Sequence, residues 1–116
     1  MPPGPSKRQQ QAAAARWWTW IADELQAEMA RFHRRRALSL RRRLLQQMLA
    51  AARAHDAAVL AAIGQEYVRR TRVLPPGIYA LCPGPGETVY LPGDRLEPGR
   101  RVASLDMGLV HPQVYR

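Results

Sequence analysis

The chain has 116 residues, with 18 Lys or Arg against nine Asp or Glu, a formal net charge of +9 and a pI near 11.2. A chain this short forms at most one domain, and alanine inflates its apolar fraction of 47%, so we expect a small core. The charge predicts an acidic partner, which could be nucleic acid, an acidic protein surface or anionic lipid. No apolar run approaches the roughly 18 residues that a membrane span needs.

The sequence offers little for catalysis or metal binding. Cys82 is the single cysteine, so an internal disulfide and a cysteine metal site are excluded. His33, His55 and His111 lack the spacing of zinc ligands, and the glycine-rich segment 83–86 lacks the Lys and Ser of a phosphate loop. We therefore predict a protein that is not an enzyme and needs no metal or cofactor. We expect it to be intracellular, with the cytoplasm, an organelle or a viral particle left open.

In chain order, residues 1–6 carry three prolines and a glycine and predict a flexible tail, with Ser6 as a helix cap. Residues 7–74 contain no proline after that tail, and Gly64 is their single glycine. They are rich in Ala, Arg, Gln, Leu and Glu, which favour helix. Seven of the ten prolines and six of the eight glycines follow from Pro75 onward, so the helical region should end at Leu74.

Within residues 7–74, apolar side chains fall into two helical stripes. On one straight rod these stripes would face nearly opposite directions. A break near residues 37–39, with Ser39 capping the second helix, would let them face each other, so we favour a hairpin of two long helices over a single rod. Asp56 and Gly64 are defects in the second stripe, and we expect a partner or self-association to complete the core. The first stripe comprises Trp18, Ile21, Leu25, Met29 and Phe32; the second comprises Leu45, Met48, Leu49, Ala52, Val59, Leu60, Ile63 and Tyr67.

The last 42 residues form a Pro/Gly-rich arm with short β segments. Residues 77–82, 87–91 and 101–105 read as strands separated by turn signals. A β-meander and an extended arm lying on a neighbour are both open, since two or three isolated strands are barely stable. Residues 106–116 read as a tail. The predicted fold class is therefore mostly α, followed by this arm.

An arginine run occupies residues 31–43, between the two stripes, and contains no acid. Arginine binds phosphate in a bidentate manner and needs no base sequence to do so. Only Asp23, Glu24 and Glu28 precede the run in the first helix, too few to neutralise it. We therefore predict a site for nucleic acid or an acidic surface, although a solvated charged loop would read the same way. Its residues are Arg31, Arg34, Arg35, Arg36, Arg41, Arg42 and Arg43.

Three tryptophans lie within four residues, at positions 17, 18 and 20. Such a cluster can anchor a protein interface, rest at a membrane surface beside basic residues, or belong to the core. As a partner-docking surface it would comprise Trp17, Trp18, Trp20, Ile21 and Leu25.

The segment Leu38-Ser-Leu-Arg-Arg-Arg-Leu-Leu45 resembles the opening helix of the LYR-motif mitochondrial proteins, and Gly64-Gln-Glu-Tyr-Val68 is similar to a later segment in one branch of that family. The resemblance covers about 30 residues and implies a small, basic, helical subunit or assembly factor. Arg41 stands at the position of the motif's tyrosine, and the Pro/Gly-rich arm departs from the family pattern.

Together these features predict a non-enzymatic accessory subunit of a large assembly, most simply a ribonucleoprotein or another nucleic-acid-containing particle. The arginine run would bind its phosphate backbone, with RNA expected ahead of DNA. One alternative is a protein–protein interaction subunit of a respiratory complex, or of a phage or viral particle, without nucleic-acid contact. Another is a peripheral membrane-surface binder that uses the tryptophans.

Overall fold

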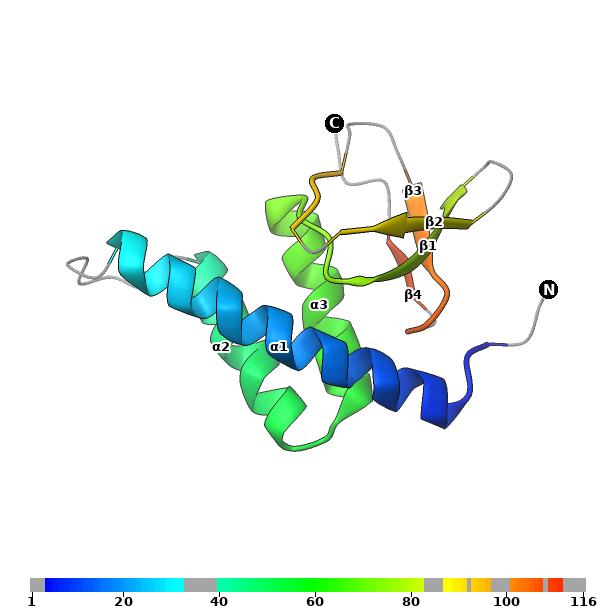
Figure 1. The fold of residues 1–116 in the computed structure, drawn as a ribbon, viewed down its shortest axis with the longest axis horizontal. Helices are drawn as coiled ribbons and strands as arrows, with labels where there is room; N and C mark the ends of the chain where they lie inside the picture. Colours follow the sequence, from blue (N-terminus) through cyan, green and yellow to red (C-terminus); the bar gives the residue numbers. More distant parts are fainter. Residues whose placement is uncertain are drawn as a thin grey trace.

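The computed structural model describes residues 4–32, 40–82, 87–91, 93–96, 101–107 and 109–111. Within them the chain is mostly helical, as expected, with three helices followed by an antiparallel sheet (Figure 1). The helices are α1 (Lys7–Phe32), α2 (Leu40–Arg53) and α3 (Ala57–Thr71). The strands are β1 (Gly77–Cys82), β2 (Glu87–Tyr90), β3 (Arg101–Ser104) and β4 (Leu109–His111).

The prediction of two long helices is wrong, because the second helical stretch is divided between α2 and α3. His55 takes a left-handed conformation (φ 55°), and its N–H donates to the Ala52 carbonyl while the Asp56 N–H donates to the Ala51 carbonyl. This pair of bonds is a Schellman motif, which ends a helix. Asp56 then caps α3, since its Oδ1 accepts a bond from the Val59 N–H at 3.1 Å. The predicted break near residues 37–39 and the Ser39 cap lie outside the described residues.

The cap predicted at Ser6 is confirmed. The Ser6 hydroxyl accepts a bond from the Gln9 N–H, and the Gln9 side-chain oxygen accepts one from the Ser6 N–H. This reciprocal capping box satisfies two backbone groups at the start of α1. Lys7 therefore begins the helix for a purely local reason.

Trp17, rather than Trp18, occupies the centre of the helical core. Trp17 is fully buried, whereas Trp18 is 36% exposed and Met29 is 53% exposed, so the predicted first stripe is wrong at these two positions. The cause lies in α3, where a Cβ at Gly64 would overlap Cζ3 and Cη2 of Trp17. The glycine leaves room for the indole and so selects which face of α1 turns inward. The side chains of α1 buried in this core are Ala13, Trp17, Trp20, Ile21 and Leu25.

The second predicted stripe is closer to the observed core. Leu45, Met48, Leu60 and Tyr67 are fully buried, as expected. Val59 is 45% exposed, because the division between α2 and α3 changes the helical phase that joined the two halves.

The strands after Pro75 form one four-stranded sheet in the order β2-β1-β3-β4. The strand positions agree with those predicted to within one residue. The order is not a simple meander, since β1 pairs with both β2 and β3, so that Ala80 is aligned with Glu87 on one side and Ala103 on the other. The segment expected to be a tail contributes β4, which pairs with β3.

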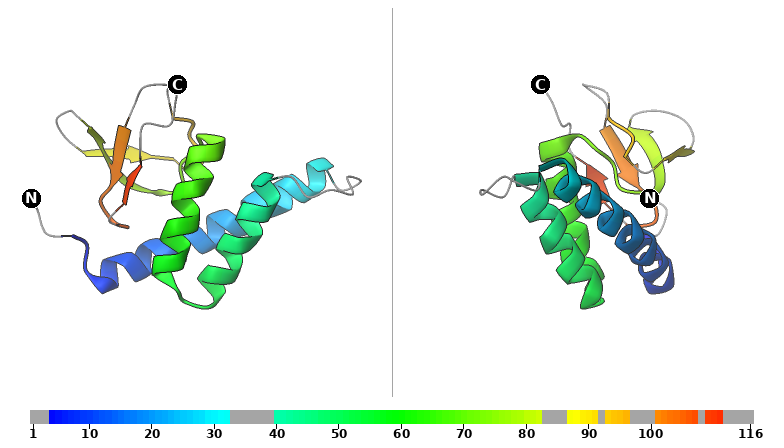
Figure 2. Two further views of the ribbon diagram at one scale, coloured as in Figure 1. Left: turned by 180° about the vertical axis from the view of Figure 1, so that it is seen from behind. Right: turned by 60° about the vertical axis from the view of Figure 1, so that its left-hand side comes forward.

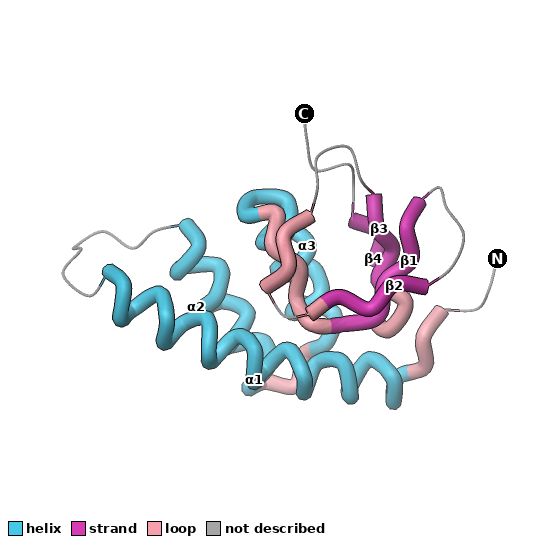
Figure 3. The backbone as a smooth tube through the Cα atoms, turned by 45° about the horizontal axis from the view of Figure 1, so that its top comes forward, coloured by secondary structure: helices cyan, strands magenta, loops and turns pink. Residues whose placement is uncertain are grey.

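The sheet lies beside α3 and over the N-terminal half of α1, so the compositional change near Leu74 does not separate two packing units (Figure 2). The Trp17 Nε1–H donates to the Pro76 carbonyl at 2.9 Å. The Tyr79 hydroxyl donates to the Pro75 carbonyl at 2.8 Å. In place of an extended arm on a neighbour, the strands cover the chain's own helices (Figure 3). A second core lies between α3 and the sheet and comprises Val68, Leu74, Tyr79, Leu96 and Val102.

Candidate nucleic-acid interface

The structure does not present the arginine run as one surface. Arg34, Arg35 and Arg36 lie outside the described residues. Arg31, in the last turn of α1, is exposed. The three arginines of the first turn of α2 diverge, as three consecutive positions on a helix must: Arg41 is half-buried, Arg42 is buried and Arg43 is exposed.

The chain's own acids engage part of the run. Arg41 forms an ion pair with Glu24 of α1, with Nη2 and Oε2 2.5 Å apart. Burial opposes the charged form of Arg41, but Tyr67 and Glu24 together outweigh it and leave the pKa of the guanidinium raised. Arg42 is 8% exposed and its Nη2 lies 3.5 Å from the Glu28 carbonyl oxygen, so it is not presented to a phosphate in this structure. The expectation that the α1 acids would leave the run unneutralised is therefore wrong for Arg41.

A polar cavity of about 300 Å³ lies between α1, α2 and the segment around Gly93. Two carboxylates and three guanidiniums line it, from Glu24, Glu28, Arg31, Arg41 and Arg95. Because the carboxylates offset most of the positive charge, this cavity is a weaker candidate for phosphate than an exposed face without acids.

Such a face exists on α2. Its outward positions recur at helical spacing and are all exposed, and α2 contains no acidic residue. The basic groups on this face are Arg43 and Arg53, at its two ends, and Gln46 and Gln47 lie between them with amide hydrogen-bond donors. We call this set the α2 polar face: Arg43, Gln46, Gln47, Ala50 and Arg53. The predicted site ends at Arg43, whereas the helical spacing i, i+3, i+4, i+7, i+10 continues the same face to Arg53.

The predicted partner-docking surface is largely interior. Trp17, Trp20, Ile21 and Leu25 are buried in the core between the helices, and the Trp20 ring meets Tyr67 edge-on, with centroids 5.4 Å apart. These four side chains cannot dock a partner without unfolding α1. The docking prediction is therefore corrected to Trp18, which faces outward.

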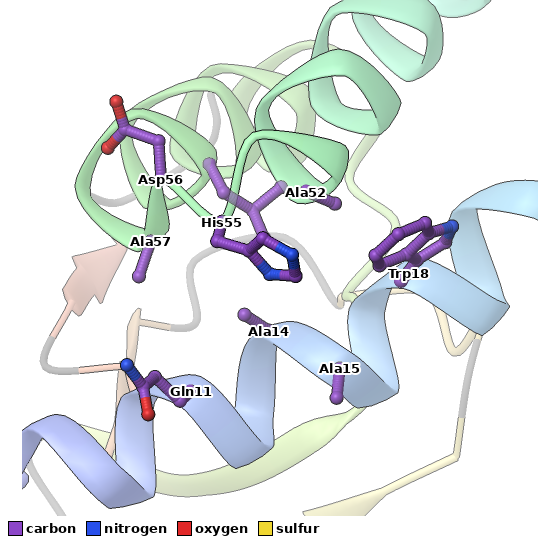
Figure 4. Close-up of a pocket in the computed structure, with 9 residues that line it drawn as sticks. Gln11, Ala14, Ala15, Trp18, Ala52, His55, Asp56 and Ala57 are labelled. Atoms are coloured by element: carbon purple, nitrogen blue, oxygen red, sulfur yellow. The ribbon is translucent and has the colours of Figure 1, made fainter.

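Trp18 stands at one end of a groove of about 360 Å³ between α1 and the turn from α2 to α3 (Figure 4). Its indole meets the His55 imidazole edge-on, with ring centroids 6.1 Å apart and an interplanar angle of 63°. The His55 ring points from the turn toward α1, whereas the Asp56 carboxylate points away from the groove toward the backbone that it caps. The remaining lining side chains are small or apolar, apart from one amide: Gln11, Ala14, Ala15, Ala52, Ala57 and Leu60.

The cysteine and the described histidines lie apart from the two surfaces above, except for His55 in the groove. Within the described ranges, no three His, Cys, Asp or Glu side chains lie close enough together to hold a metal ion. Cys82 ends β1, His55 lies in the α2–α3 turn, His111 ends β4, and His33 lies outside these ranges. None of the helices in the described part of the chain is both long and apolar enough to cross a membrane.

Comparison of the chain with protein-family models, curated proteins and solved structures finds no match. The resemblance of residues 38–45 to the LYR-motif proteins is thus not accompanied by a family match and carries no part of the proposal below.

Proposed function

We propose that the protein is a non-enzymatic accessory subunit that binds the phosphate backbone of nucleic acid, with single-stranded RNA as the simplest partner. The α2 polar face carries this proposal. It combines exposed arginines and glutamines on a helix without acids, in a chain of net charge +9. Exposed guanidinium and amide donors on a helix that itself carries no carboxylate suit a phosphate backbone.

The dimensions of the face support contact with several nucleotides. Arg43 and Arg53 are ten positions apart on α2, which corresponds to about 15 Å along the helix axis. Arg31, at the exposed end of α1, adds a further cation near the start of α2. Residues 34–36 of the arginine run join these two helices in sequence. A backbone that follows α2 would therefore meet guanidiniums at both ends of the helix.

The test measures the affinity of the full chain for oligouridylate as a function of salt. Phosphate binding predicts a linear fall of log affinity with log salt, with a slope of about −0.7 per phosphate contacted. Replacing Arg43→Glu and Arg53→Glu together should weaken binding about tenfold or more at low salt and make the slope shallower. A matched control, Arg69→Glu with Arg70→Glu, changes the net charge equally on α3 and should have the smaller effect.

Two results would contradict the proposal. Absence of binding to RNA and to DNA at low salt would leave an acidic protein surface as the occupant of the α2 polar face. Equal weakening by the α2 and α3 variants would show that net charge matters and that this face does not. The membrane alternative predicts a blue shift of tryptophan fluorescence with anionic vesicles, and Trp18→Ala would remove that shift.

A further inference from the structure

We propose that the groove between α1 and the α2–α3 turn holds a nucleobase of a single-stranded nucleic acid, stacked on the Trp18 ring with the His55 imidazole beside it. This inference rests on the proposed function and names the part of the ligand that the groove recognises. Single-stranded nucleic acid presents unpaired bases, and proteins bind them by stacking on aromatic side chains.

The shape of the groove suits one flat ring system. Its volume of about 360 Å³ lies at the small end of the range for ligand pockets, roughly 300 to 1,000 Å³. Alanine side chains line both sides of the groove, the Trp18 ring stands at one end, and the His55 ring projects toward the middle (Figure 4). Trp18 and His55 meet edge-on, so each leaves a ring face for a further aromatic group.

Polar groups are few and distinct in role. The Gln11 amide offers both a donor and an acceptor to a base edge. The His55 imidazole adds ring nitrogens within the groove. Asp56 also lines the groove, but its carboxylate caps α3 and points away from the space between the rings and Gln11.

The conformation of His55 is a second, independent observation. His55 occupies the left-handed position of the Schellman motif, where glycine is the usual residue because it has no Cβ. A histidine there is strained by comparison, and strained residues gather at binding sites. The imidazole packs edge-on with Trp18 and lines the groove, so the same ring is placed to contact a ligand there.

The charge around the groove favours a nucleotide over a neutral aromatic group. Lys7 and Arg8 are exposed and precede Gln11 by one helical turn, on the same side of α1. No acid occurs in α1 before Asp23. Arg53, at the end of the α2 polar face, comes two residues before His55. A phosphate attached to a base in the groove would therefore meet cations from either helix.

The experiment compares oligothymidylate with an abasic oligodeoxynucleotide of the same length, using the full chain. The base-containing strand should bind about tenfold more tightly, which corresponds to about 1.4 kcal/mol. It should also quench tryptophan fluorescence, and the abasic strand should not. Trp18 is responsible for that signal because Trp17 and Trp20 are buried.

Three variants separate contact from folding. Trp18→Ala should abolish the preference for the base-containing strand while leaving abasic binding intact. His55→Gly should weaken that preference and keep the fold, since glycine suits the left-handed position. Met29→Ala, which removes an exposed apolar side chain elsewhere on α1, should change neither.

The two proposals fail in different ways. If both strands bind equally well and Trp18→Ala has no effect, the groove does not hold a base, although the proposed phosphate binding stands. If neither strand binds, both proposals are wrong. Binding of oligothymidylate that survives in both Trp18→Ala and His55→Gly with its preference unchanged would place base recognition elsewhere.

Discussion

Gly64 and Trp17 show how one residue pair can decide the face of a helix. From sequence, Gly64 is a weakness in a helix, and Trp18 rather than Trp17 belongs to the predicted apolar stripe. The structure makes the glycine a recess for the Trp17 ring, and the neighbouring tryptophan is left at the surface. Helical periodicity could not reveal this, because the choice depends on contact between residues 47 positions apart in α1 and α3.

We expect Gly64→Ala to destabilise the protein by up to about 2 kcal/mol. In an open helix the change would stabilise by about 1 kcal/mol, but here the methyl group overlaps the Trp17 ring, and overpacking costs about 1–3 kcal/mol. Chemical denaturation monitored by circular dichroism would measure it. Ala62→Gly, at an exposed position of α3, reports helix propensity alone.

A double-mutant cycle tests whether overlap with the Trp17 ring causes the loss of stability expected for Gly64→Ala. Combining Gly64→Ala with Trp17→Leu should make the glycine replacement less harmful, because the overlapping ring atoms are gone. A stabilising effect of Gly64→Ala in the unmodified background would contradict the packing described for Trp17.

At the scale of elements, the sequence predicts features set by neighbouring residues, but not how the helices are divided or how the strands pair. The Ser6 cap and the strand positions follow from neighbouring residues, and the sequence predicts both; the part played by Gln9 in the cap is seen only in the structure. From sequence, Asp56 is a defect in a long helix. Its role as the cap of α3 appears only because the chain turns at His55. The order β2-β1-β3-β4 was likewise hidden, since strand pairing depends on contacts distant in sequence. The same limit applies to the interface: the sequence identified Arg31 and Arg43, but not that Arg42 turns inward.

The last turns of α3 carry an acid-sensitive contact. Glu66 accepts hydrogen bonds from Arg69 and Arg70, which lower its pKa from 4.5 to about 2. Because the folded pKa is below the unfolded one, this contribution to stability is present above pH 4.5 and is lost as the pH falls toward 2.

We therefore expect the free energy of unfolding to fall more steeply between pH 5 and about pH 2 in the natural protein than in Glu66→Gln. The difference should be small, since these side chains are exposed and solvent screens them. Denaturant titrations at several pH values would measure it, and high salt should reduce it. Identical pH profiles would show that the contact does not contribute in solution.

At the scale of the whole molecule, specific polar contacts between described residues tie the helices to the sheet, in addition to the second core. Asp106, which follows β3, is buried and pairs with Arg16 of α1 at 2.8 Å, and its other carboxylate oxygen lies 3.1 Å from the Ser104 hydroxyl. With the Trp17 bond to Pro76, these contacts connect the two cores. The helices and the sheet should therefore unfold in a single transition.

Asp106→Ala tests that coupling. Leaving the Ser104 hydroxyl and the Arg16 guanidinium without this partner should cost about 1–3 kcal/mol. The midpoint of unfolding should move equally for tryptophan fluorescence, which reports the helical core, and for amide exchange in β1. A shift confined to β1 would show that the sheet unfolds separately from the helices.

The bond from Trp17 to Pro76 spans 59 residues, and this has a consequence for synthesis. A ribosome adds about 5 to 20 residues per second, so the indole waits roughly 3 to 12 seconds before its acceptor has been translated. The recess at Gly64 is also made after Trp17. The Trp17 indole of a nascent chain is therefore without its recess and its acceptor until about two thirds of the polypeptide has been made, although α2 is available to cover α1 before then.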